Sequence, residues 1–310
     1  MHRFALGILA IVLSLIAAAC SDDAATDETT ASTASPVTTA TTPTTAAPAT
    51  TAAPGTTAAQ STMDAPVAPF SSLDAPLAAI QVDGDASDWD GIAGLDMTLV
   101  EITGETVDSQ DATVKVAHDG EYLYMLFAVP DDYDFVLEDH KLSPAIGVMW
   151  AIDAGAGPAM GATEDDQETS LGLVDIWHWE LDCVAGAEQG GSVSGPGDGT
   201  GGNDAACNMD DEYSTDPETR EDDDTASAEN SLLGVFEHTN PVDGEDGTWY
   251  FEMSRPLQTG DAQDAQFTVG GTGMLAMAYW DPDVSVEGWD DATHVVSAVE
   301  GWIGVTLLRN

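Results

Sequence analysis

Basic residues are scarce in this sequence: six lysines and arginines stand against 56 aspartates and glutamates, which gives a formal net charge of −50 over 310 residues. A chain with so few cations repels the phosphates of nucleic acid and the surface of anionic lipids. Nucleic acid is therefore excluded as a partner. The acidity itself has two explanations that composition does not separate: a saline habitat, or divalent cations bound among the carboxylates.

Long apolar runs are also rare, and the clearest one lies at the N-terminus, over residues 4–16. It is too short to span a bilayer as a permanent helix, and the small residues after it are typical of a secretory signal. The segment Leu15-Ile16-Ala17-Ala18-Ala19-Cys20 resembles a bacterial lipobox, in which cleavage precedes a diacylated cysteine. We therefore predict a lipoprotein signal peptide at residues 1–19, lipidation of Cys20, and an extracytoplasmic location anchored to the cell membrane.

Only three cysteines are present. If Cys20 carries lipid, Cys183 and Cys207 remain as an even pair in an oxidising compartment, so we predict a disulfide between them. Such a bridge removes unfolded-chain entropy worth roughly 3 kcal/mol. Metal binding is the alternative, but two isolated thiols supply too few ligands for a site.

Large apolar side chains are nearly absent from the Thr-, Ala- and Pro-rich stretch that follows the signal. Such a segment cannot bury a core, so we predict a disordered tether over residues 20–78 and a single folded domain over residues 79–310. A Gly- and Asp-rich insertion at residues 185–230 also has few apolar side chains, and we expect it to be a long acidic surface loop.

The folded part shows alternating strand patterns and no convincing helical period. Asp119-Gly120 indicates a tight hairpin, and Asp243-Gly244 with Asp246-Gly247 indicate another turn. We predict an all-β fold, an antiparallel β-sandwich of jelly-roll or immunoglobulin-like type with long loops. The expected strands are 80–82, 97–102, 112–118, 122–129, 145–152, 171–181, 232–238, 248–254, 266–269, 274–280, 294–298 and 302–308.

The stretch 171–181 contains the most distinctive pattern. At a period of two, Trp177, Trp179 and Leu181 share one face, and His178 and Glu180 share the other with Ile176. The tryptophans indicate a core strand. The imidazole and carboxylate on the opposite face are roughly 7 Å apart by strand rise. They form a candidate site, and the alternative is a partly buried histidine bonded to backbone.

Residues 83–91 place carboxylates at alternate positions with glycine in the turn, which suits a hard cation such as Ca²⁺. The segment lacks the distal glutamate of an EF-hand, and a solvated run of charge is the alternative. Its pattern Asp-Gly-x-x-x-Asp-Trp resembles the opening of β-sandwich domains related to carbohydrate-binding module family nine.

Further motifs occur in a fixed order: Val114-Lys115-Val116-Ala117-His118-Asp119-Gly120, then Val174-Asp175-Ile176-Trp177-His178-Trp179, Arg255-Pro256-Leu257 and Ala276-Met277-Ala278-Tyr279-Trp280-Asp281. Together they resemble the cytochrome c-552/DMSO reductase-like haem-binding domain of ethylbenzene dehydrogenase gamma subunits, over about residues 79–308. The resemblance implies a sandwich that holds one b-type haem with axial Met and Lys ligands. It also implies an accessory role, passing electrons to or from a molybdenum oxidoreductase, rather than an enzyme acting alone.

Met149 is the candidate axial methionine, because it shares a strand face with the small residues Ala145, Gly147 and Ala151. Packing of Met149 as an ordinary core side chain is the alternative. Family members commonly have a lysine directly after Trp-His-Trp, whereas this chain has Glu180. The predicted haem contacts are therefore Met149 and His178 as iron ligands, with Trp177 and Trp179 beside them.

Two functions follow from the sequence. The first is a lipid-anchored haem b domain that exchanges electrons with a redox partner protein. The alternative is a carbohydrate- or Ca²⁺-dependent ligand-binding module without haem.

Overall fold

The computed structural model describes residues 69–101, 109–137, 139–158, 160, 172–181, 192–194, 209–216, 219–222, 231–285, 287–289, 293–297 and 301–309. Cys20, Cys183 and Cys207 lie outside these residues, as do the signal peptide and most of the tether, so the lipidation and the disulfide stay predictions. Within the described residues, no helix has the length and hydrophobicity needed to cross a membrane. The helical elements there are short 3-10 turns: η1 (Ala86–Trp89), η2 (His140–Leu142) and η3 (Pro282–Val284).

Strands form the rest of the regular structure in the described part of the chain. They are β1 (Ser71–Ala75), β2 (Leu95–Glu101), β3 (Gln110–His118), β4 (Tyr122–Val129), β5 (Ala145–Ala151), β6 (Val174–Glu180), β7 (Ser192–Ser194), β8 (Met209–Asp216), β9 (Thr219–Asp222), β10 (Leu233–His238), β11 (Trp249–Pro256), β12 (Thr272–Trp280), β13 (Val295–Val296) and β14 (Ile303–Leu307).

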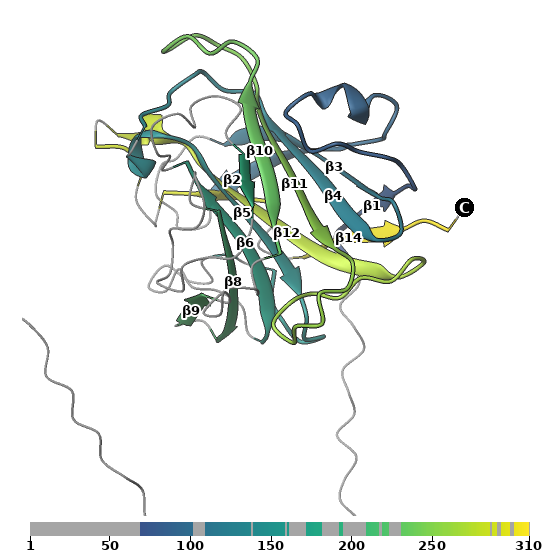
Figure 1. The fold of residues 1–310 in the computed structure, drawn as a ribbon. Helices are drawn as coiled ribbons and strands as arrows, with labels where there is room; N and C mark the ends of the chain where they lie inside the picture. Colours follow the sequence, from purple (N-terminus) through teal and green to yellow (C-terminus); the bar gives the residue numbers. More distant parts are fainter. Residues whose placement is uncertain are drawn as a thin grey trace, which may run out of the picture. The chain divides into compact units, whose positions relative to one another are not determined.

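The strands pair in the order β7-β10-β11-β4-β3-β2-β13-β12-β5-β6-β8-β9, with β14 also beside β12 and β1 beside β14. Strands β10, β11, β4 and β3 run side by side in Figure 1, as do β5, β6 and β8. We call β7 to β2 in this order the first layer and β13 to β9 the second layer. All pairs are antiparallel except β1 with β14. The predicted all-β antiparallel sandwich is confirmed.

The main core lies between the two layers, because both contribute to the same large hydrophobic cluster. Trp177, Trp179 and Leu181 are fully buried in this cluster. The first layer faces them with Phe251 of β11 and Phe127 of β4, among others. The prediction that Trp177 and Trp179 form the inner face of a core strand is therefore confirmed.

The β3–β4 hairpin shows why its sequence folds locally. Asp119 Oδ1 accepts hydrogen bonds from the backbone N–H groups of Glu121 at 2.8 Å and Tyr122 at 2.7 Å. Gly120 has a φ of +97°, a left-handed conformation that glycine adopts without a steric penalty. The hairpin predicted from Asp119-Gly120 is confirmed, and β4 has the predicted limits.

Several predicted boundaries need correction. The fold begins before residue 79, because Ser71–Ala75 is a strand that pairs with β14. The segments 80–82 and 266–269 are not strands. The insertion is not only a surface loop: within it, β7 pairs with β10 and β8 pairs with β6. The composition of β8 concealed this strand, because the side chains of Asp210, Asp211 and Glu212 are buried against other strands instead of in water.

Candidate functional site

Met149 and His178 project from the same face of the second layer, the outer face that lies away from the main core. In the register of β5 and β6, Gly147 pairs with His178 and Met149 pairs with Ile176. Met149 and His178 are therefore diagonal neighbours, for which the spacing is roughly 7–8 Å, within reach of long side chains. The predicted thioether and imidazole lie next to each other.

Small residues surround Met149 on this outer face. Across the β5–β12 pairing, Ala276 lies opposite Met149 and Ala278 lies opposite Gly147. The residues without bulky side chains, which we call the small floor, are Ala145, Gly147, Ala151, Ala276 and Ala278. The floor lacks bulky side chains over two strands, which permits another group to approach the backbone closely.

His178 is buried between two carboxylates. Its Nε2 lies 3.5 Å from Glu180 Oε1, and its Nδ1 lies 3.7 Å from Glu212 Oε2. The ring centroid is 5.6 Å from that of Trp280. The predicted pairing of His178 with Glu180 on one face is confirmed, and Glu212 of β8 is a neighbour that the sequence did not indicate.

Bulky side chains cover the outer face, Trp280 from the end of β12 and the others from segments outside β5, β6 and β12. We call this set the cover: Met160, Trp280, Trp289, His294 and Trp302. Trp280 stacks on His294, with ring centroids 4.8 Å apart and planes inclined by 27°. His294 Nε2 lies 3.1 Å from the carbonyl oxygen of Met160. Trp280 Nε1 is buried without a hydrogen-bond partner among the described residues. The cover thus brings a second imidazole and a second thioether to the face that holds Met149 and His178.

The donor chemistry on this face fits a b-type haem, for which protein thioethers and imidazoles are ordinary axial ligands. The space directly above the floor is filled, however. A Cβ atom added to Gly147 would lie 3.2 Å from Met160 Sδ and 3.4 Å from Trp280 Cζ3. The thioether and imidazole donors on this face therefore suit an iron ion. Entry of the macrocycle requires the side chains of Met160 and Trp280 to turn away from the small floor.

The structure does not bring all four predicted haem contacts together. Trp177 and Trp179 lie in the main core, on the other face of the strand that carries His178. Their grouping with Met149 is corrected, because strand alternation places the sheet between them. No lysine takes the family position, and Lys115 is committed elsewhere: its Nζ donates to the carbonyl oxygen of Trp89 at 3.0 Å.

A buried arginine with three aspartates is a second cluster, which the sequence analysis missed. Arg255 Nη1 lies 3.0 Å from Asp175 Oδ1, 3.3 Å from Asp211 Oδ1 and 3.3 Å from Asp264 Oδ1. Among the described residues, these aspartates are the one set of three metal-ligating side chains with donor atoms within 4.8 Å of one another. The guanidinium already lies at the point of convergence, so we assign the cluster to Arg255 rather than to a metal ion. Asp175 and Arg255 stand in the family-like motifs, but nothing in the sequence signalled Asp264.

Two carboxylates of residues 83–91, those of Asp83 and Asp85, accept hydrogen bonds within their own turn. Asp83 Oδ1 accepts from the N–H of Asp85 at 3.0 Å, and Asp85 Oδ1 accepts from the N–H of Ser87 at 3.0 Å. Neither residue belongs to a convergent set of three ligands in the described part of the chain. The arrangement stabilises the turn before η1, and the calcium interpretation gains no support from it.

The fold and the outer face define a class: an all-β sandwich whose second layer carries a thioether and an imidazole on its outer face. The sequence profile of the ethylbenzene dehydrogenase family matches residues 86–292, and the chain belongs to this family. Among curated proteins, no sequence matches the chain.

The solved structures that resemble the chain include three at low identity. A Bacteroides uniformis protein has 10% identity and a TM-score of 0.45, covering 77% of this chain and 99% of its own. A family nine carbohydrate-binding module from Caldicellulosiruptor kristjanssonii, in complex with glucose, has 12% identity and a TM-score of 0.39, covering 77% and 95%. The same type of module with cellotriose has 12% identity and a TM-score of 0.41, covering 77% and 94%.

Proposed function

We propose that this chain is a lipid-anchored, extracytoplasmic domain that binds one b-type haem without a covalent link and carries electrons. The observation that carries the proposal is the adjacency of Met149 and His178 over the small floor, in a chain of the ethylbenzene dehydrogenase family. The sequence has no Cys-x-x-Cys-His attachment motif, which is consistent with non-covalent binding. A bound haem supplies a reversible one-electron couple.

The chain's own residues have distinct roles in this proposal. Met149 would hold the iron through a neutral thioether, which raises the potential. His178 would serve as the second ligand or as a hydrogen-bond partner of the haem. Met149 and His178 rise from one sheet face, and His294 of the cover would supply a further imidazole from the side that faces them.

The proposed context is a membrane surface. Lipidation of Cys20 would hold the domain outside the cytoplasmic membrane, where a redox partner such as a molybdenum oxidoreductase exchanges electrons with it. Cys20→Ala should move the protein from the detergent phase to the aqueous phase in a phase-partition assay. Retention of the variant in the detergent phase at the parent's level would contradict the anchoring.

The haem proposal is tested by the visible spectrum of the full-length protein purified from a haem-competent host. We expect a Soret band that sharpens and shifts on reduction, and Met149→Ala should convert it to a high-spin or weakly bound form. Met277→Ala is the matched control, because Met277 is equally buried but lies in the main core. If Met277→Ala changes the spectrum as much as Met149→Ala, the ligand assignment is lost.

A second candidate is the ligand-binding module without haem. It is favoured by the packing of Met160 and Trp280 over Gly147, which fills the space above the small floor with side chains of the chain itself. A haem-supplemented protein that shows no Soret band above free haem would establish this alternative over the electron-transfer proposal.

A further inference from the structure

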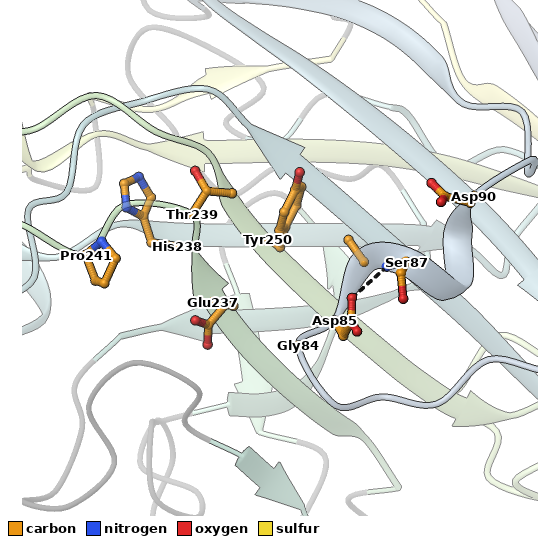
Figure 2. A pocket seen from close by; sticks show the side chains of 10 residues that line it. Gly84, Asp85, Ser87, Asp90, Glu237, His238, Thr239, Pro241 and Tyr250 are labelled. Atoms are coloured by element: carbon orange, nitrogen blue, oxygen red, sulfur yellow. Dashed lines mark hydrogen bonds between the residues drawn. The ribbon is translucent and has the colours of Figure 1, made fainter.

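A pocket of about 580 Å³ lies on the other layer of the sandwich, away from the small floor and its cover. One wall is the turn from Gly84 to Asp90, and the other is the end of β10 with the residues that follow it. Figure 2 shows Tyr250 of β11 between these two walls. Glu237 and Tyr250 are directly opposed in the β10–β11 register, so both stand on the pocket side of the sheet. The volume is within the range of small-ligand sites.

Hydrogen bonds to β11 and β3 fix the backbone of the turn that forms the first wall of the pocket. Glu252 Oε2 accepts from the N–H of Gly84 at 2.6 Å, and Glu252 Oε1 accepts from Trp89 Nε1 at 2.6 Å. Lys115 Nζ donates to the carbonyl oxygen of Trp89 at 3.0 Å. A wall with its backbone fixed in this way is preorganised, so a ligand loses little free energy in ordering it.

The lining is rich in hydrogen-bond acceptors and contains no lysine or arginine. Its carboxylates belong to Asp85, Asp90 and Glu237, and its one aromatic ring accessible beside them is that of Tyr250. These three carboxylates are absent from the convergent ligand sets of the described residues. Carboxylates spread along a groove do not surround a single metal ion, and they instead match a ligand with several separated positive groups.

We propose that this pocket binds a linear ligand carrying two or more ammonium groups, with the charges at Asp90 and Glu237 and the intervening chain over the Tyr250 ring. An ammonium group gains from a carboxylate and from the face of a tyrosine ring together. The strongly negative field of the whole chain raises the local concentration of such cations. This site is independent of the haem proposal, because it lies on the first layer.

The test is isothermal titration of the full-length protein with spermidine at about 0.15 M salt, where the screening length is about 8 Å and diffuse binding is suppressed. We expect one site, weakened about fivefold or more by Glu237→Gln and by Asp90→Asn, as for loss of one charge-assisted contact. Tyr250→Phe should bind nearly as well as the parent, because the ring remains. Tri-lysine in a second titration distinguishes a peptide source of the ammonium groups from a free polyamine.

Glu121→Gln is the matched control, because it removes one exposed carboxylate in the β3–β4 hairpin, outside the lining. Equal weakening by Glu121→Gln, or several equivalent sites, would show attraction to the overall charge and overturn the proposal. Binding of neutral cellotriose that depends on Glu237, without binding of spermidine or tri-lysine, would also overturn it. Unchanged thermal melting of each variant ensures that folding is not the cause.

Discussion

Trp89 and Glu252 are joined by a buried hydrogen bond of 2.6 Å between Trp89 Nε1 and Glu252 Oε1, although they are 163 positions apart in the chain. The other oxygen of Glu252 accepts from the N–H groups of Asp83 at 3.1 Å and Gly84 at 2.6 Å. One carboxylate thus ties the Asp-Gly-x-x-x-Asp-Trp motif to β11. The motif therefore has a structural role, because it covers the outer face of the first layer, where Trp89 packs with Ala117 of β3 and Leu126 of β4.

Glu252→Gln should therefore destabilise the domain by about 2 kcal/mol, because the amide retains one acceptor oxygen for three donors. Urea unfolding followed by tryptophan fluorescence measures the change. Glu245→Gln, at an exposed position in the β10–β11 connection, should change stability by less than about 0.5 kcal/mol. Equal effects of the two substitutions would mean that the Glu252 contacts contribute nothing.

Arg255 is the one cation in its buried cluster, against Asp175, Asp211 and Asp264. Burial raises the pKa of Asp175 to about 6, although the charge of Arg255 acts to lower it. Arg255→Met leaves buried carboxylates without their cation and should cost about 3–5 kcal/mol or prevent folding. Arg309→Met, at an exposed arginine, is the control and should be nearly neutral in urea unfolding.

Asp264→Asn provides a second measurement on this cluster if Arg255→Met does not fold. The carboxylate oxygens of Asp264 have no hydrogen-bond partner among the described residues. Because Asp264 Oδ1 lies 3.3 Å from Arg255 Nη1, this variant removes one of the three carboxylates around the guanidinium, and it should cost clearly less than the roughly 3–5 kcal/mol expected for Arg255→Met. A large loss of stability would show that the ionised Asp264 is needed to hold Arg255.

Stability should also decrease as pH rises, because of Asp134. Burial, followed by the charges of Asp131 and Asp281, raises the pKa of Asp134 to about 9 from its ordinary 3.8. The folded state binds this proton more tightly than the unfolded state. The contribution is therefore complete below pH 3.8 and is lost as pH rises toward 9.

Asp134→Asn imitates the protonated acid, so it should flatten the decrease in melting temperature between pH 5 and pH 8. We expect the parent to melt at a lower temperature than the variant at pH 8, and the difference to be smaller at pH 5. Asp74→Asn, on the exposed side of β1, should leave the pH profile of the parent unchanged. A parent profile that rises with pH would show that Asp134 is ionised in the folded protein.

The sequence predicted the sandwich because strand alternation and turn chemistry are local signals. Two such predictions are confirmed. Trp177 and Trp179 lie on the face of β6 opposite to that of His178 and Glu180, and Asp119-Gly120 forms a tight hairpin. β8 could not be predicted in the same way. Its sequence Met-Asp-Asp-Glu-Tyr-Ser-Thr-Asp is typical of a solvent-exposed segment, but Asp211 is buried beside Arg255 and Glu212 beside His178.

The candidate site was predictable only in part for the same reason. The face shared by Met149 with Ala145 and Ala151 follows from alternation along one strand. The cover does not, because Met160 and His294 are brought to this face by long-range packing with no repeated pattern. The tether limit was wrong because β1 has few large apolar residues, and its pairing with β14 stabilises it instead.

The sulfur of Met160 lies over Gly147 on the small floor. Met160→Ala should destabilise the haem-free protein by about 2 kcal/mol, as for other large-to-small changes in packed clusters. If haem displaces this side chain, the substitution destabilises the haem-free protein but not the haem-bound protein. The affinity for haem should then rise roughly tenfold or more. Competition with apomyoglobin for limiting haem measures it, with Met149→Ala expected to change affinity in the opposite direction. If both substitutions lower the affinity for haem, Met160 contacts the bound haem and is not displaced by it.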